Sequence, residues 1–345
     1  MASNFVARVF LLFLLSISSV FAGPYSSLNI KQMYVLGDSL SDQGNLFAAT
    51  SLLGSGVGAP ALPASDSYYQ GRFSNGEVFS GVLAKRFGVV LKPSLAGGNN
   101  FAFGGATTDT NHAEAYYPPG VFPWSLNAER DAFLQRVATS GVDANALFVV
   151  ASGANDLSDA LEQGMDPATT IAKTVQGIAN AVLAFKSAGA RNVLVVNVPN
   201  LGLAPLITRY GPSASAMGTE ISRQFNMALD ETIRAVPGVN IVRFDMFGLL
   251  NKVTETPAKF GFSNVTTPCY SGFVVPDPTA TVCANPDRHL YWDLEHPTTK
   301  AHTLLADYLV TAVSYCRILG SFGLLGEYSD TNGTAPAYTK CLIRG

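Results

Sequence analysis

Residues 34–45 read Tyr34-Val35-Leu36-Gly37-Asp38-Ser39-Leu40-Ser41-Asp42-Gln43-Gly44-Asn45. The apolar run that begins at Met33 favours a buried β-strand, and the change to small polar residues at Gly37 predicts a tight turn. In an open α/β sheet, ligands bind beyond the carboxyl ends of the strands. We therefore expect the Ser39 hydroxyl at the rim of a cleft, with the backbone amides of the turn pointing into that cleft.

Continuous apolar runs of strand length recur along the chain, at residues 146–151, 192–198 and 240–245. Such runs are typical of strands that are buried on both faces of a sheet. Helical periodicity predicts helices over residues 76–87, 126–137, 167–188, 213–235 and 297–315. Strands that alternate with helices indicate a three-layer α/β/α sandwich around a central, mainly parallel sheet.

Two local signals add detail to this pattern. Residues 99–107 resemble a further short strand that runs into the Gly104-Gly105 turn, and Pro297 is predicted at the first position of the last helix. The last clear strand is the one at residues 240–245. The chain contains no internal repeat, linker or low-complexity segment, so we expect one domain over residues 23–345.

The composition excludes several classes of partner. With 345 residues the chain is long enough to bury a large core, while only 14% of its residues are charged and its net charge is −3. No basic run or Lys/Arg stripe indicates nucleic-acid binding. No basic amphipathic helix indicates binding to a membrane surface.

The first 22 residues have the pattern of a secretory signal peptide. Arg8 supplies the positive charge, residues 9–20 are almost wholly apolar, and Val20-Phe21-Ala22 precedes Gly23. The apolar run is short for a membrane span, so an uncleaved anchor is the less favoured alternative. We expect cleavage after Ala22 and a secreted or periplasmic mature protein with no stable membrane anchor, most simply a monomer.

All of the cysteines lie in the C-terminal quarter, at Cys269, Cys283, Cys316 and Cys341. An even number in an exported chain predicts disulfides. Three pairings are possible, and Cys269–Cys283 with Cys316–Cys341 is favoured because neighbouring cysteines close short loops. Zinc is the alternative, but no Cys-x-x-Cys or matching histidine spacing supports it, so no metal is expected. The tail around Cys341 is rich in Gly, Ser, Thr and Asn and is not expected to bury much surface by itself.

A nucleophilic serine needs a base, usually a histidine, and that histidine needs a carboxylate to orient its ring. Asp293 and His296 lie three residues apart, just before Pro297, so the two side chains can meet across one turn. This spacing alone is common by chance. The remaining histidines are weaker candidates for the base. His112 lies in the aromatic loop and could line the cleft, and nothing nearby prepares His289 for the role. His302 falls within the predicted last helix, where an ordinary surface or hydrogen-bonded histidine is favoured.

Acyl chemistry on a serine also needs hydrogen-bond donors for the negative oxygen of the tetrahedral intermediate. The candidate donors are the backbone amides of Ser39 and Gly105 and the side-chain amide of Asn155. Gly105 has no Cβ and so allows a close approach to its backbone, and Asn155 follows the strand at residues 146–151. A plain glycine turn and an Asx-turn are the structural alternatives.

The candidate residues lie in four short stretches of the sequence, which we call blocks. They are residues 37–45, Asn100-Phe101-Ala102-Phe103-Gly104-Gly105-Ala106-Thr107, Gly153-Ala154-Asn155-Asp156 and Trp292-Asp293-Leu294-Glu295-His296-Pro297-Thr298. In this order they resemble the GDSL (also called SGNH) family of esterases and lipases, over residues 32–315. Leu36 stands where that family often has Phe. A Gly-x-Ser-x-Gly elbow is absent from the sequence, which argues against the unrelated α/β-hydrolase fold.

The resemblance implies a flavodoxin-like sandwich and a serine hydrolase that acts on carboxylic esters through an acyl-enzyme, without metal or cofactor. It makes Ser39 the nucleophile, His296 the base and Asp293 its orienting carboxylate, with Ser39, Gly105 and Asn155 as oxyanion donors. Similar bacterial members are often called lecithinases or haemolysins, but no residue here selects a phosphodiester headgroup. A phospholipase, an acyltransferase that uses the same site, and an inactive secreted binding module remain the alternatives.

Specificity within such a family belongs to the loops. Here the loops are residues 51–75 and 109–124, which are rich in aromatic side chains. These side chains either line a pocket for the small-molecule or lipid ester, or pack the loops together. They are Tyr68, Tyr69, Phe73, Tyr116, Tyr117, Phe122 and Trp124.

Overall fold

The computed structural model describes residues 28–117, 122, 124–143 and 145–344, so the predicted signal peptide lies outside the described residues. Its strands form one mixed sheet in the order β1-β2-β3-β4-β6-β5. The strands are β1 Met33–Gly37, β2 Leu147–Ala151, β3 Asn192–Val196, β4 Asn240–Phe244, β5 Gly326–Ser329 and β6 Thr339–Ile343. Strands β1 to β4 are parallel, whereas β6 runs antiparallel to β4 and β5 antiparallel to β6. The predicted mainly parallel sheet is confirmed.

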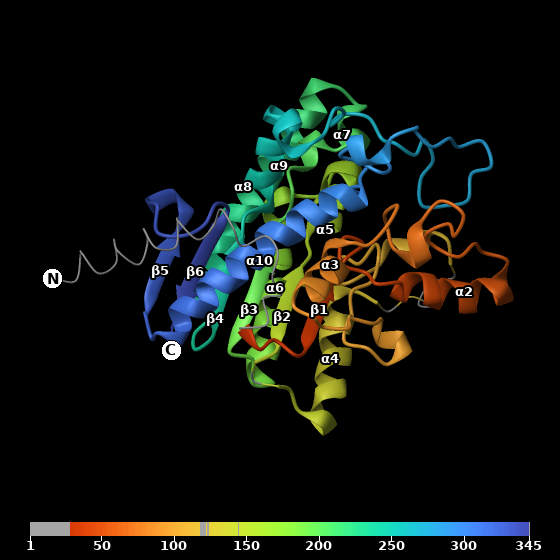
Figure 1. Cartoon of the computed structure of the whole chain (residues 1–345). Coiled ribbons are helices and arrows are strands. Elements are labelled where there is room, and N and C mark those ends of the chain that lie inside the picture. The colour runs from red at the N-terminus through yellow and green to blue at the C-terminus, as the bar shows by residue number, and fades with distance from the viewer. Residues whose placement is uncertain (1–27, 118–121, 123, 144, 345) are drawn as a thin grey trace.

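Helices cover both faces of this sheet. The helices of the described residues are α2 Asn45–Val57, α3 Phe79–Arg86, α4 Leu126–Ser140, α5 Ala154–Gln163, α6 Pro167–Ser187, α7 Pro205–Thr208, α8 Pro212–Arg234, α9 Met246–Glu255 and α10 Thr299–Ser321. Helices α3, α9 and α10 pack on one face and α4, α5, α6 and α8 on the other. Figure 1 shows α10 crossing the near face of the sheet. The three-layer α/β/α sandwich is therefore confirmed.

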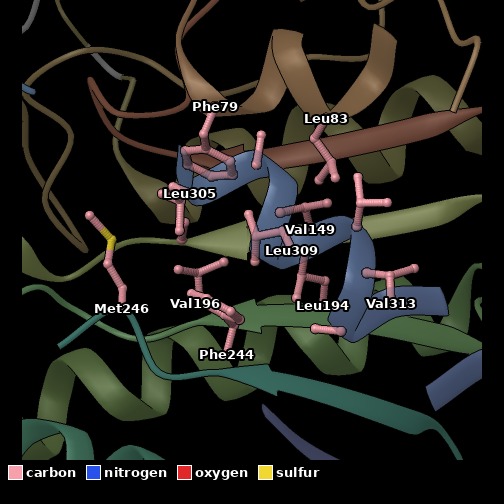
Figure 2. Close-up of a cluster of buried hydrophobic side chains, with 14 of the residues drawn as sticks. Phe79, Leu83, Val149, Leu194, Val196, Phe244, Met246, Leu305, Leu309 and Val313 are labelled. Atoms are coloured by element: carbon pink, nitrogen blue, oxygen red, sulfur yellow. The ribbon is translucent and has the colours of Figure 1, made fainter. Parts of the chain in front are cut away.

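Successive side chains of strands β1 to β4 point to opposite faces, and both sets are almost wholly buried. Val149 of β2, for example, packs on the face that α10 covers, whereas its neighbour Phe148 packs on the other face. Figure 2 shows Val149 and strand residues of β3 and β4 facing Leu309 of α10, with Leu83 of α3 closing the cluster. Burial on both faces explains why the strands read as continuous apolar runs.

The predicted strand at residues 99–107 does not form. The segment instead runs beside β1 and is held by a few hydrogen bonds, from Val35 N–H to Asn99 C=O at 3.1 Å and from Phe101 N–H to Val35 C=O at 2.8 Å. A single β-bridge joins Val35 to Asn100. One further bond joins Phe103 N–H to Gly37 C=O at 3.2 Å, and the chain then turns away at Gly104 and Gly105.

The helix predictions also need correction. The last helix begins at Thr299 rather than at Pro297, because the Thr298 side chain caps it by accepting the Ala301 N–H at 3.4 Å, and it continues past residue 315 to Ser321. Helices α2, α5, α7 and α9 were not predicted. Helices α2 and α5 each begin immediately after a glycine with positive φ, Gly44 and Gly153, in a stretch whose polar motif hides helical periodicity.

The C-terminal tail buries more than its composition predicts. Strand β6 pairs with β4, and Cys341 within it is fully buried and forms a disulfide with Cys316 of α10. The tail needs little apolar surface of its own because β4 supplies hydrogen-bond partners and α10 supplies a packing surface. The tail is thus buried through its partners rather than by itself, and the expected bridge to Cys316 fastens it to the body of the protein.

Candidate active site

The carboxyl ends of the parallel strands meet at one edge of the sheet, and a cavity opens there. Ser39 follows β1, Asn155 follows β2 and Met246 follows β4, and all of them line this cavity together with His296. Most of the remaining lining is apolar, with Leu40, Ala154, Pro199, Leu201, Ala204, Leu206, Ile207, Leu250 and Pro297. The structure thus brings together residues that are more than 250 positions apart in the sequence.

A chain of hydrogen bonds connects Ser39, His296 and Asp293. The Ser39 Oγ lies 3.0 Å from His296 Nε2, and His296 Nδ1 lies 2.7 Å from Asp293 Oδ2. All three side chains are buried, and Asp293 is fully inaccessible. The turn after β1 places Ser39, whereas the loop of residues 286–298, which we call the His296 loop, places the other two. In this arrangement the imidazole can take a proton from the hydroxyl while the carboxylate holds the opposite nitrogen.

Burial and charge act in opposite directions on this pair. Burial alone lowers the pKa of His296, but the Asp293 carboxylate and its hydrogen bond outweigh burial and raise this pKa to about 9. Burial alone raises the pKa of Asp293, but the His296 charge and the hydrogen bonds from His296 and Tyr68 lower it below its usual value. A Glu295 oxygen lies 3.6 Å from His296 Nε2 and adds to the rise of the His296 pKa.

Each oxygen of Asp293 is held by two donors. The backbone N–H groups of Glu295 and His296 donate to Oδ1 at 2.9 Å and 2.7 Å. The Tyr68 hydroxyl donates to Oδ2 at 2.5 Å, beside His296 Nδ1. The carboxylate therefore has a single well-defined orientation. The contact from Tyr68 was not predicted, because no spacing rule relates residues 225 positions apart.

The turn at residues 103–105 lies close to the end of β1 and is held by two buried carboxylates. Asp42 accepts the Gly104 N–H at 2.9 Å, and Glu129 of α4 accepts the N–H groups of Phe103 and Gly37 at 3.0 Å and 2.8 Å. Burial raises the pKa of Glu129 well above its usual value. Asp42 lies within the first of the four sequence blocks, whereas a single glutamate in a predicted helix gave no sign of the role of Glu129.

The three predicted oxyanion donors are placed as follows. Gly105 has a φ of +73°, which favours glycine, and neither its amide nor that of Ser39 has a hydrogen-bond acceptor among the described residues. The Asn155 side-chain amide donates one hydrogen to Ala106 C=O at 2.9 Å, and Asn155 also lines the cavity. This bond fixes the orientation of the amide and leaves its second hydrogen available.

Most of the aromatic side chains that were predicted to contact substrate are buried within the loops rather than in the lining of the cavity. None of the seven is among the described residues that line the cavity. Phe122 and Tyr117 are buried together, and Trp124 stacks on Phe103 with ring centroids 4.9 Å apart. Phe73 is buried with its ring 5.0 Å from that of His296. Tyr69 and Tyr116 are exposed, and a role for them in binding substrate stays a prediction.

The favoured disulfide pairing is the one observed. Besides Cys316–Cys341, Cys269 bonds to Cys283 in a loop that lies against the His296 loop. The Cys269 N–H donates to Tyr291 C=O at 3.1 Å, and the Tyr270 N–H donates to Trp292 C=O at 2.6 Å. These bonds attach the disulfide loop to the residues just before Asp293.

The three other histidines, His112, His289 and His302, each contact a different group. His112 pairs with Asp159 at 3.0 Å, His289 lies near Thr267 C=O at 3.3 Å, and His302 accepts the Phe79 N–H at 3.2 Å. Within the described ranges, no cluster of three or more His, Cys, Asp or Glu side chains is arranged to hold a metal ion. No helix of the described residues is long and apolar enough to cross a membrane.

The α/β/α sandwich with a Ser–His–Asp hydrogen-bond chain at its strand ends has the arrangement of a serine hydrolase. More particularly, the chain belongs to the GDSL-like lipase/acylhydrolase family, whose family model matches residues 33–309.

Three relatives illustrate the range of that family. A GDSL esterase/lipase of Arabidopsis thaliana, At1g74460, is 24% identical over 82% of this chain and 87% of its own length. The thermolabile hemolysin of Vibrio parahaemolyticus is 25% identical over 87% of this chain and 65% of its own length. The phosphatidylcholine-sterol acyltransferase of Aeromonas hydrophila is 26% identical over 82% of this chain and 90% of its own length.

Proposed function

We propose that the protein is an exported serine hydrolase that cleaves carboxylic esters through an acyl-enzyme on Ser39. The observation that carries this proposal is the hydrogen-bond chain from Ser39 Oγ through His296 to Asp293, with distances of 3.0 Å and 2.7 Å. Export is supported by the signal-peptide pattern of residues 1–22 and by two disulfides, which are typical of exported proteins.

In the first half of the proposed reaction, Ser39 Oγ attacks the ester carbonyl carbon while His296 Nε2 takes the hydroxyl proton. The carbonyl oxygen becomes negative in the resulting tetrahedral intermediate. Asp293 stabilises the imidazolium and keeps Nε2 directed at Ser39. The imidazolium then donates its proton to the alcohol oxygen, the carbon–oxygen bond breaks, and the acyl group remains on Ser39.

The negative oxygen of the intermediate is assigned to three donors, namely the amides of Ser39 and Gly105 and the side chain of Asn155. The two backbone amides have no acceptor among the described residues, so each can donate to a bound oxygen without breaking an existing bond. Glu129 and Asp42 hold the turn that carries Gly105. Donors fixed in this way need no reorganisation during the reaction.

In the second half, a water molecule attacks the acyl carbon and gives a proton to His296 Nε2. The second tetrahedral intermediate then collapses, and the imidazolium returns the proton to Ser39 Oγ as the carboxylic acid leaves. The proposed steps use only these side chains, the backbone amides and water.

The apolar wall of the cavity supports a substrate with a hydrocarbon portion. Met246, Leu250 and Pro297 line both this cavity and a second apolar hollow between α9 and the first turns of α10. The shared residues make the two hollows neighbours, and we propose that the hydrocarbon portion of the substrate extends from the cavity toward the second hollow. We therefore propose that small or lipid esters of apolar acids are the substrates.

Acyl transfer to an alcohol is the second candidate function, because an acyl-enzyme can react with an alcohol instead of water. The similarity to the phosphatidylcholine-sterol acyltransferase of Aeromonas hydrophila favours acyl transfer over a binding role without catalysis.

The test is hydrolysis of nitrophenyl esters with acyl chains of increasing length, with and without micelles, by the mature protein and by Ser39→Ala. We expect turnover that requires Ser39 and increases with acyl chain length until the acyl chain fills the cavity and the second hollow. Repeating the assay with an added alcohol measures how the acyl group divides between water and alcohol. No turnover of any ester by the folded protein would instead support a binding module.

A further inference from the structure

Tyr68 makes a side-chain contact that neither the family motifs nor the proposed reaction steps account for. Its hydroxyl donates to Asp293 Oδ2 at 2.5 Å, the same oxygen that His296 Nδ1 contacts at 2.7 Å. Tyr68 is 3% exposed and Asp293 is 0% exposed, so water does not compete for this bond. Tyr68 lies outside the lining of the cavity, which separates it from a substrate-binding role.

We propose that Tyr68 is a positioning residue for the Asp293–His296 pair, so that it sets the orientation and proton affinity of the base without touching the substrate. This inference rests on the proposed function of Ser39 and His296, and it assigns Tyr68 a role different from the substrate contact that the sequence suggested.

The geometry supports this role because, of the four donors to Asp293 among the described residues, only Tyr68 lies outside the His296 loop. The other three belong to Glu295 and His296, which move with Asp293. A bond from within the same loop cannot set the position of that loop relative to the rest of the molecule. The bond from Tyr68 can, because Tyr68 belongs to the loop that follows α2.

The Tyr68 ring is itself held in place. It packs edge to face on Tyr270 with centroids 5.8 Å apart, in a cluster with Trp292 and the Cys269–Cys283 disulfide. The Tyr68 N–H donates to Ala64 C=O at 3.1 Å, and the Ala64 N–H donates to Val274 C=O at 2.9 Å. The disulfide loop thus supports both Tyr68 and the segment that leads to Asp293.

The surroundings of the Tyr68–Asp293 hydrogen bond keep the Tyr68 hydroxyl protonated, so that it remains a donor. Burial, followed by the neighbouring Asp293 charge, raises the pKa of the Tyr68 phenol far above its usual value, with smaller contributions from Tyr270 and Glu295. Tyr68 therefore keeps its proton and donates throughout the working pH range.

The base itself faces three carboxylates, Asp293, Glu295 and Asp38, which all raise the pKa of His296. Of these, only Asp293 is bonded to Tyr68. Loss of the phenol leaves the negative charge of Asp293 Oδ2 less dispersed, so the imidazolium holds its proton more strongly. The acid limb of the activity profile then moves to higher pH, and a looser carboxylate lowers kcat.

The test compares Tyr68→Phe with Tyr270→Phe in the mature protein. Both tyrosines are buried in the same cluster, but the Tyr270 hydroxyl has no hydrogen-bond partner among the described residues, so its removal breaks no such bond. For Tyr68→Phe we expect kcat to fall roughly 10-fold, below the roughly 100-fold cost of a 1 Å misplacement. We also expect an unchanged KM and an acid limb at higher pH, while Tyr270→Phe matches the wild type.

A second variant tests the sign of the effect. Replacing Tyr68 by 3-fluorotyrosine keeps the shape of the ring but makes the phenol a stronger donor, so the acid limb should move to lower pH. The proton NMR signal of His296 Nδ1–H reports the same bond without any substrate. It should shift in both Tyr68 variants and stay unchanged in Tyr270→Phe.

Several results would overturn the inference. A higher KM with unchanged kcat makes Tyr68 a substrate contact, and a lower melting temperature with unchanged kinetics and NMR signal makes it purely structural. Ser39→Ala separates these failures from failure of the proposed function. If Ser39→Ala is inactive while both Tyr68 variants behave like Tyr270→Phe, only the inference about Tyr68 is wrong. If Ser39→Ala keeps full activity, the proposed function itself is wrong.

Discussion

Two regions of the molecule each combine an aspartate that has charged partners with a nearby disulfide. They are the His296 loop and the side of the sheet formed by β4 and β6 with the helices packed against them, which we call the β4–β6 edge. At the His296 loop, Asp293 pairs with His296 and the Cys269–Cys283 loop lies alongside. At the β4–β6 edge, Asp230 of α8 contacts Arg243 and Lys340 at 2.7 Å and 2.6 Å. The Arg243 contact is a close charge pair whose Nε–H is not aligned for a hydrogen bond.

The two regions contain similar interactions, but these interactions have different roles. In the first region the bonds orient a side chain toward Ser39, while in the second they join α8 and α10 to the last strands. Changes at the His296 loop should therefore alter activity more than stability, and changes at the β4–β6 edge should do the opposite.

The largest expected effect belongs to Ser39→Ala and His296→Ala. Each should lower kcat by roughly six orders of magnitude, and the double variant should lose about as much as either single variant, because a nucleophile and its base act as a unit. The melting temperature should change little in Ser39→Ala, whereas His296→Ala also leaves the buried Asp293 charge without its partner and should lower it. Ester hydrolysis and thermal unfolding measure the two quantities. Losses that multiply in the double variant would contradict the pairing.

Replacing Asp293 or Asp230 by asparagine should show the difference between the two regions most clearly. Asp293→Asn should lower kcat by roughly 10⁴-fold, because an amide stabilises the wrong tautomer of the imidazole. Asp230→Asn should leave kcat unchanged but lower the free energy of unfolding by about 3 kcal/mol or less, since its ion pairs are only partly buried. Denaturant unfolding and kinetics on both variants make the comparison. A loss of kcat in Asp230→Asn would contradict the expected difference between the two regions.

Asn155→Ala should lower kcat by roughly 10²–10³-fold with little change in KM, because its amide is assigned to the developing oxyanion rather than to the bound ester. Steady-state kinetics separate the two parameters. A higher KM with kcat preserved would make Asn155 a contact of the ground-state substrate. Gly105→Ala serves as a companion variant and should also be damaging, because an added Cβ lies 3.1 Å from Asn111 Oδ1 at positive φ.

The two disulfides test the comparison again with a smaller effect. Cys341→Ser opens a 25-residue loop and should lower the free energy of unfolding by about 3 kcal/mol, with kcat of the folded protein retained. Cys283→Ser should lower activity more than Cys341→Ser does, because its loop is bonded to the residues before Asp293. A reducing agent should lower the melting temperature. Equal activity in the two variants would remove the distinction between the regions.

The smallest expected effect is the pH dependence. The Asp293 carboxylate raises the pKa of His296 above its ordinary value of 6.5, and only the neutral imidazole can accept the Ser39 proton. Activity should therefore rise with pH above 6.5, reach half of its maximum near pH 9 and level off above that pH. The same shift stabilises the folded state below pH 6.5, and this contribution is lost as pH rises through the folded pKa. A profile already level at pH 6 would contradict the assigned base.

Sequence patterns predicted the parts of this molecule that are local or periodic. The strands that carry Leu36 and Val149 were recognisable because sheets buried on both faces require apolar residues at every position. Neither the one-turn spacing of Asp293 and His296 nor the small polar turn at Ser39 was sufficient by itself. These residues were assigned because four ordered blocks of the sequence resemble the GDSL family.

The rest depends on contacts between distant segments. Strands β5, at the edge, and β6, next to it, carry polar residues such as Glu327 and Lys340, so neither apolar continuity nor alternation marks them. The bond from Tyr68 to Asp293 and the bonds from Glu129 to the turn at Phe103 link segments that no pattern relates. Tertiary placement decides such contacts, so the support of the site was not predictable whereas its reacting groups were.

The central claim, that Ser39 is an activated nucleophile, is tested most directly by labelling the mature protein with a fluorophosphonate. Only a serine with an effective base reacts rapidly with such a reagent. The account predicts one label per molecule, located on Ser39 by peptide mass mapping, absent in Ser39→Ala and strongly slowed in His296→Ala. No labelling of the folded protein, or equal labelling of Ser39→Ala, would contradict it.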